Sequence, residues 1–218
     1  SGVSAPAVVR QVGRGTRAEA IDAGGPRSFL VRAAVPAGII LPLLITFGIA
    51  AAGEWISGLD SDEIGVTEVT SSNAVYWILT FTVVVGALCA GYAQASAMRG
   101  TARDLDRYLF PRSWTSALSR WLFYGALTAL VSAVLVALVM IALPLVFPQV
   151  YGQVDLFSAT GARFLLTVPV YAFFACGLAV GLAGVIGHPA ATLAALLLWV
   201  FVAEDAAVFL PNGSRIQS

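Results

Sequence analysis

The most polar stretch of an otherwise apolar chain is residues 98–121, MRGTARDLDRYLFPRSWTSALSRW. It holds five arginines, two aspartates and several large aromatic residues. Guanidinium groups bind carboxylates and phosphates, and arginine and aromatic residues are enriched at protein interfaces. The first question is therefore what a charged segment does between two apolar runs.

Catalytic chemistry is not indicated anywhere in the chain. No Ser–His–Asp constellation, pair of carboxylates in a polar setting or HExxH motif occurs. All 12 basic residues are arginine, so the lysine with which a P-loop reaches nucleotide phosphates is missing. Cys89 and Cys176 lie in apolar runs and are expected to be small buried hydrophobes, and His188 precedes Pro189 at an expected turn. We predict that the chain is not an enzyme, has no metal site and holds no cofactor.

Long apolar runs indicate a membrane protein. Of the 218 residues, 59% are hydrophobic and 11% are charged, whereas soluble domains have about 25% charged residues. About 20 apolar residues cross the hydrocarbon core of a bilayer. We predict an all-α, polytopic transmembrane helix bundle. An N-terminal segment, 1–32, with a short amphipathic helix at the membrane surface precedes a transmembrane domain, 33–218, with five spans at about 33–53, 74–97, 121–147, 164–187 and 189–203.

The distribution of arginine predicts the orientation of the spans. Five arginines precede the first span and five lie in 98–121, and two spans separate these segments. Residues 54–73 are acidic, with no basic residue. Since cytoplasmic loops carry an excess of arginine and lysine, we expect a multi-pass protein of the cell membrane, in a bacterial inner membrane, with the N-terminus in the cytoplasm. The zero net charge gives no field that favours nucleic acid.

Residues 98–121 are predicted to contain two helical pieces. Thr101 and Asp104 fit the start of a helix with Thr101 as the N-cap, Leu105, Tyr108 and Leu109 give it one apolar face, and Pro111 stops it. After the break, an apolar stripe runs into the third span. It consists of Trp114, Ala117, Leu118, Trp121 and Leu122.

Two roles remain open for this segment. Its arginines could simply hold the loop in the cytoplasm, with Arg112 and Arg120 at the level of the lipid headgroups. Alternatively, a short helix that presents charges and aromatic side chains could dock into a groove of another protein.

Small residues within the spans favour close helix packing. Gly177 and Gly181 form a G-x-x-x-G pattern in 177–187, and Gly184 extends it. Such faces let transmembrane helices approach one another closely. We expect these glycines to pack within the chain or against another membrane helix, and to have no chemical role.

The order of these elements resembles the permeases of ABC-2 type transporters. The resemblance rests on one span, an acidic outer loop, a second span, a segment with small, polar and Gly-Thr residues, and then a third span. The residues that carry it are Gly100, Thr101, Leu105, Leu109, Pro111, Arg112, Ser113 and Arg120, together with the pre-span segment 17–36. The chain departs from the family at 97–99, Ala-Met-Arg, where an acidic residue is usual, and in its span count, because the family has six. A sixth span would be expected after the segment that begins at Glu204, so either it lies beyond Ser218 or the protein is a shorter variant.

The resemblance implies a coupling helix that contacts a separate ATP-binding cassette subunit, which would bind ATP and Mg and hydrolyse the nucleotide. Its residues would be Gly100, Thr101, Arg103, Asp104, Leu105, Arg107, Tyr108, Phe110, Pro111 and Arg112. The segment 7–28 would be an interfacial connecting helix, and a second permease subunit, identical or different, would complete the transporter. Membrane lipids would surround it.

Three functions are thus compared. The first is the permease subunit of an exporter for a hydrophobic or lipid-like substrate. The second is a non-catalytic membrane anchor or assembly subunit of a larger complex. The third, a small secondary carrier or membrane enzyme, is disfavoured because ionisable groups at membrane depth, which such proteins need, are nearly absent from the spans.

Overall fold

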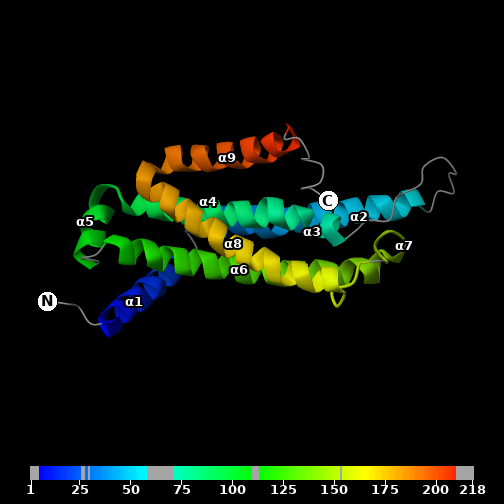
Figure 1. Ribbon diagram of the computed structural model, residues 1–218, viewed down its shortest axis with the longest axis horizontal. Helices are drawn as coiled ribbons and strands as arrows, with labels where there is room; N and C mark the ends of the chain where they lie inside the picture. Colours follow the sequence, from blue (N-terminus) through cyan, green and yellow to red (C-terminus); the bar gives the residue numbers. More distant parts are fainter. Residues whose placement is uncertain are drawn as a thin grey trace.

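A computed structural model describes residues 5–25, 28, 30–57, 71–109, 113–152 and 154–209, and all regular structure in this part of the chain is helical (Figure 1). The helices run lengthwise beside one another, and α1 leaves the bundle at an angle near one end. In chain order they are α1 (Ala5–Ala23), η1 (Leu30–Ala34), η2 (Pro36–Ile40), α2 (Leu41–Ser57), α3 (Ser71–Trp77), η3 (Ile78–Val83), α4 (Val84–Ala97), α5 (Gly100–Leu109), α6 (Ser113–Val146), α7 (Pro148–Tyr151), α8 (Ala159–Ile186) and α9 (Pro189–Phe209).

Four stretches are long and apolar enough to cross a membrane. They are Leu30–Ile56, Ala74–Ala97, Trp114–Val146 and Ala159–Ile186. The expected count of five is not confirmed, because the apolar part of α9 that the structure describes, Pro189–Val202, is shorter than these four. The first, third and fourth spans begin earlier than predicted. In each case the helix already begins in polar or amphipathic turns that precede the apolar run.

The boundaries of the long helices have local causes. Ser158 is the N-cap of α8, and its hydroxyl accepts a hydrogen bond of 3.0 Å from the backbone N–H of Gly161. Gly187 ends α8 with φ at 65°, a left-handed conformation that glycine adopts without strain. This confirms the turn expected at 187–189. Pro144 lies within α6, which continues to Val146, and Pro148 begins α7.

Three π-helical segments widen the first two spans. η1 and η2 precede α2, and η3 joins α3 to α4, so that the first two candidate spans each change helical pitch. Pro36 begins η2 and has no backbone N–H to donate. The hydroxyl of Thr82 in η3 donates a 2.6 Å hydrogen bond to the carbonyl oxygen of Gly38 in η2. Such π-helical turns often occur at functional sites.

Two buried clusters hold the bundle together. The larger one joins α2, α3, η3, α6, α7 and α8, and its fully buried members include Val75, Ile78, Val139 and Leu143. The smaller one lies towards α5 and joins α4, α6 and α8 through residues such as Tyr124 and Cys176. The two cysteines are buried free thiols, as expected for small hydrophobes.

Glycines at helix crossings let α4, α6 and α8 approach closely. A Cβ atom at Gly177 would lie 2.7 Å from the indole of Trp121. This indole is fixed, since its Nε1–H donates a 3.0 Å hydrogen bond to the carbonyl of Phe173. In contrast, a Cβ at Gly181 or Gly184 would meet nothing within 4 Å. Of the three predicted packing glycines, Gly177 alone packs against another helix among the described residues.

This difference predicts the outcome of two alanine substitutions. We expect Gly177→Ala to destabilise the protein by about 1–3 kcal/mol, because overpacking forces a fixed ring to move. Gly181→Ala is expected to be neutral or stabilising by up to about 1 kcal/mol, because alanine loses less entropy than glycine in a helix. Thermal unfolding of both variants in detergent, followed by circular dichroism, measures the difference. Equal losses in the two variants would contradict this account of the α6–α8 contact.

Candidate functional site

The short helix α5 lies across one end of the bundle, between the end of α4 and the start of α6 (Figure 1). It begins at Gly100, whose φ of 55° lets the chain turn sharply after α4. The sequence predicted Thr101 as the N-cap. The helix begins one residue earlier, so Thr101 lies within its first turn. The helix ends at Leu109, close to the expected stop at Pro111.

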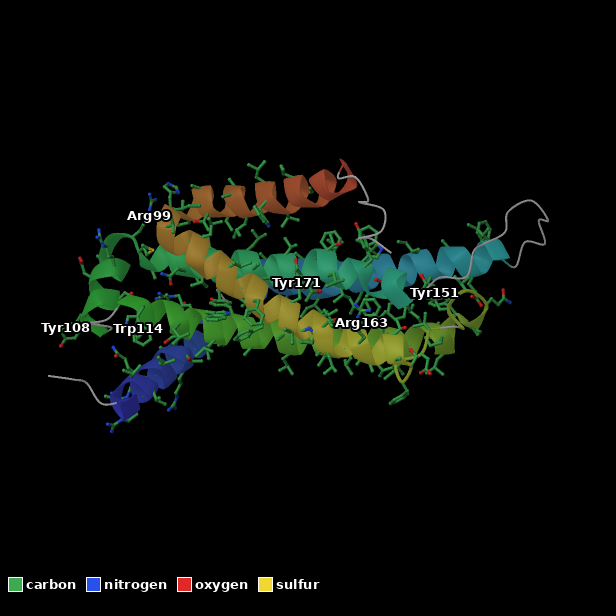
Figure 2. The ribbon with its side chains drawn as sticks, viewed as in Figure 1. Arg99, Tyr108, Trp114, Tyr151, Arg163 and Tyr171 are labelled. Atoms are coloured by element: carbon green, nitrogen blue, oxygen red, sulfur yellow. The ribbon has the colours of Figure 1, made fainter. Side chains whose placement is uncertain are left out.

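Side chains of α5 point in two directions. Thr101, Arg103, Asp104 and Tyr108 are exposed, whereas Asp106 faces the bundle. The ring of Tyr108, predicted to lie on the apolar face, is 84% exposed. Figure 2 shows Arg99, Tyr108 and Trp114 at this same end of the molecule, with Arg163 and Tyr151 towards the other. The outward face of α5 thus presents charges and an aromatic ring at the surface of the protein.

Arg120, which was expected at the level of the lipid headgroups, is buried among other helices at this end. It is 6% exposed and lies about two turns after the start of α6 at Ser113. Its Nε lies 2.8 Å from Oε1 of Glu19 in α1, and its Nη2 lies 2.8 Å from Oδ1 of Asp106 in α5. Its Nη1 donates a 3.0 Å hydrogen bond to Oε1 of Gln94 in α4. One guanidinium therefore joins four helices.

Ser116 completes this arrangement, which we name the Arg120 network: Glu19, Gln94, Asp106, Ser116 and Arg120. The hydroxyl of Ser116 donates to Oδ1 of Asp106 at 2.7 Å and accepts from Nη1 of Arg120. A buried ion pair is stable only when its remaining donors and acceptors are satisfied. All three guanidinium nitrogens have partners here, so the network holds α5 to the bundle by directional contacts.

The carboxyl of Glu19 has a pKa that its surroundings change in two opposite ways. Burial raises the pKa of its carboxyl above the ordinary value of 4.5, and the nearby charge of Asp22 adds to this effect. The positive charge of Arg120 acts in the opposite direction and lowers the pKa. Burial therefore outweighs the charge of Arg120 in its effect on the pKa of this carboxyl.

The first turns of α6 also hold α1 in place. Ser119 is buried, and its hydroxyl lies 2.8 Å from the carbonyl oxygen of Thr115 and 3.2 Å from that of Val12 in α1. A hydroxyl has one proton, so it can serve one of the two acceptors at a time. Together with the pair between Glu19 and Arg120, this contact packs α1 against α6.

The structure brings together only part of the predicted partner-binding set. Gly100, Thr101, Arg103, Asp104 and Tyr108 lie on one exposed helix and turn. The side chains of Leu105 and Arg107, and residues Phe110, Pro111 and Arg112, lie outside the described residues.

Sequence reasoning missed the Arg120 network. An arginine seven residues inside a helix that continues as an apolar span was the available signal, because such a charge requires a partner. The partners themselves could not be read from the sequence, since Glu19 and Gln94 are distant along the chain. From the sequence, Asp106 was one of two aspartates in the charged segment, and no partner was predicted for it.

Comparisons with known proteins yield no relative. No family model matches the chain, and neither the curated proteins nor the solved structures contain a significant match. The geometry of the site therefore carries the functional argument.

Proposed function

We propose that this protein is the membrane-spanning permease subunit of an ABC exporter, and that α5 is its coupling helix. One observation carries the proposal: a short, outward-facing helix is joined by a buried arginine to three other helices of an apolar bundle. A force applied to α5 by a partner would be transmitted through Asp106 and Arg120 to α6, and from there to α1 and α4. ATP and Mg would be bound by the separate ATP-binding subunit.

The proposed orientation places the α5 end in the cytoplasm of a bacterial cell, with the protein in the inner membrane. Arg14 and Arg17 of α1 and Arg99 and Arg103 near α5 are exposed at this end, which suits the arginine bias of cytoplasmic loops. Because four candidate spans, an even number, precede α9, this helix would begin on the same side of the membrane as α1 and α5. In the proposed orientation α9 would be a fifth span, and a second permease subunit would complete the pathway for a hydrophobic or lipid-like substrate.

A charge reversal on the exposed face of α5 tests the coupling role. We expect Arg103→Glu to lower the ATP turnover of the assembled complex about fivefold or more, a typical coupling effect, while the protein still inserts into the membrane. The matched control is Arg163→Glu, since Arg163 is exposed near the opposite end. The measurement is phosphate release by the complex with its ATP-binding subunit in nanodiscs.

The rival function is a membrane anchor or assembly subunit without transport. Under that function, the tagged protein would purify with a membrane enzyme that has no ATP-binding cassette. Arg103→Glu would then weaken assembly without any effect on ATP hydrolysis. A gene for an ATP-binding cassette protein beside this one, with its product in the purified complex, would support the exporter.

A further inference from the structure

A cavity of about 620 Å³ lies beside the Arg120 network, between α1, the turn that follows it, α4 and α6. The charged residues described on its wall are Glu19, Asp22 and Arg120. The guanidinium is already engaged by Glu19 and Asp106. Two carboxylates and this one paired guanidinium lie on the described part of the wall, which therefore has an excess of negative charge.

Two tyrosines add a second kind of contact to this cavity. Tyr92 of α4 and Tyr124 of α6 both line it. The face of an aromatic ring attracts a cation within about 6 Å, and quaternary ammonium groups are recognised in this way. Carboxylates and tyrosine rings on the same wall therefore favour an organic cation over an anion or a neutral sugar.

A second, apolar cavity of about 210 Å³ continues from the first, and both are lined by Leu30, Cys89 and Tyr124. Each wall continues deeper into the bundle: from Ser96 to Val85 along α4, and from Arg120 to Leu127 along α6. The π-helical segments η1, η2 and η3 contribute further walls. The two cavities are therefore adjacent, and their lining changes from one with charged residues to one that is almost wholly apolar.

The size of the apolar cavity restricts its occupant. A water molecule takes about 30 Å³ of liquid volume, so 210 Å³ holds roughly seven groups of that size. This is enough for most of a ten-carbon chain, whose carbons nearest the head would lie in the first cavity, and not for the two acyl chains of a membrane phospholipid. The occupant must then combine one chain with one cationic head.

We propose that these two cavities form a binding site for a water-borne, single-chain cationic amphiphile, with its ammonium group beside Glu19, Asp22 and the tyrosines and its alkyl chain in the apolar cavity. The inference rests on the proposed function in one respect: if the protein is an exporter, this amphiphile is its substrate class. Binding itself requires neither ATP nor the partner subunit.

The first test measures the equilibrium binding of radiolabelled alkyltrimethylammonium salts to the protein in phosphatidylcholine nanodiscs, with empty nanodiscs subtracted. Decyltrimethylammonium is expected to bind saturably with one site per chain. Tetramethylammonium, which has no tail, and decyl sulfate, which reverses the charge, are expected to bind at least tenfold more weakly. Adding phosphatidylethanolamine to the nanodiscs should not compete. Competition by this lipid would assign the site to a membrane lipid and overturn the proposal.

Two variants test the two cavities separately. Asp22→Asn should weaken decyltrimethylammonium binding about threefold, as for an exposed ion pair, while Asp155→Asn, in the turn before α8, should not. Leu127→Trp fills the apolar cavity and should remove the advantage of the decyl chain over the tetramethyl compound. Its control is Leu130→Trp, because Leu130 is 63% exposed on the same helix.

The outcomes separate this inference from the transport function. Equal binding of decyl sulfate, or full binding by both Asp22→Asn and Leu127→Trp, would overturn the binding site. If Leu127→Trp fails to fold, the ligand series on the unchanged protein still decides the matter. If the ligand binds normally but Arg103→Glu does not change ATP hydrolysis, the binding site is supported and the exporter function is rejected.

Discussion

Replacing Arg120 by leucine is expected to lower the free energy of unfolding by about 3 kcal/mol, the largest loss we predict for any single side chain here. Removing one partner of a buried ion pair typically costs about 3–5 kcal/mol. The side chains of Glu19 and Asp106 keep 18% and 21% of their surface exposed, which places the expected loss at the lower end. Two carboxylates would then face each other without the cation between them.

Reversible unfolding in mixed micelles, followed by tryptophan fluorescence, would measure this loss. Arg163→Leu is the control, because Arg163 is exposed and should change stability by less than about 0.5 kcal/mol. Adding Glu19→Gln and Asp106→Asn to Arg120→Leu should restore part of the stability, since no buried charge then remains unpaired. A triple variant as unstable as Arg120→Leu alone would show that the loss comes from packing.

The spans could be predicted because their signal is local. An apolar run defines a candidate span by its own length and composition, and the expected range 74–97 coincides with the structural one. The division of 98–121 into two helices was also predicted from a local signal, because Pro111 disfavours a continuous helix there and α5 ends just before it, at Leu109. The span count was less certain, since the apolar part of α9 is short.

The site could not be predicted because its contacts are distant in sequence. Arg120 looked like a headgroup arginine at the polar edge of a span, and only the folded chain brings Glu19 and Gln94 beside it. Tyr108 has helical spacing with its apolar neighbours, yet its ring points away from the bundle. A helical period identifies an apolar face and does not show which face has a partner to pack against.

The glycines make the same point about packing. Gly177, Gly181 and Gly184 share a pattern, but Trp121 fills the space beside the first of them alone. Gly125 in α6 was not singled out by the sequence, and a Cβ there would lie 2.8 Å from the ring of Phe173. Small residues permit close approach, and the neighbouring helix decides where it occurs.

In the complex with an ATP-binding subunit that we propose, Asp106→Ala is expected to lower ATP turnover about tenfold, within the usual range of coupling energies. The side chain of Asp106 accepts hydrogen bonds from Arg120 and Ser116, and these contacts fix α5 to α6. Asp104→Ala is the matched control, because Asp104 lies on the exposed face of the same helix.

The two aspartates separate partner binding from transmission. Asp106→Ala should still capture the ATP-binding subunit, because Arg103 and Tyr108 remain on the outer face. The bundle should stay folded, since Glu19 keeps its pair with Arg120. Loss of turnover with binding preserved would mean that force passes from α5 through Arg120. If Asp104→Ala lowers turnover as much as Asp106→Ala, the outer surface alone matters and the Arg120 network does not transmit the force.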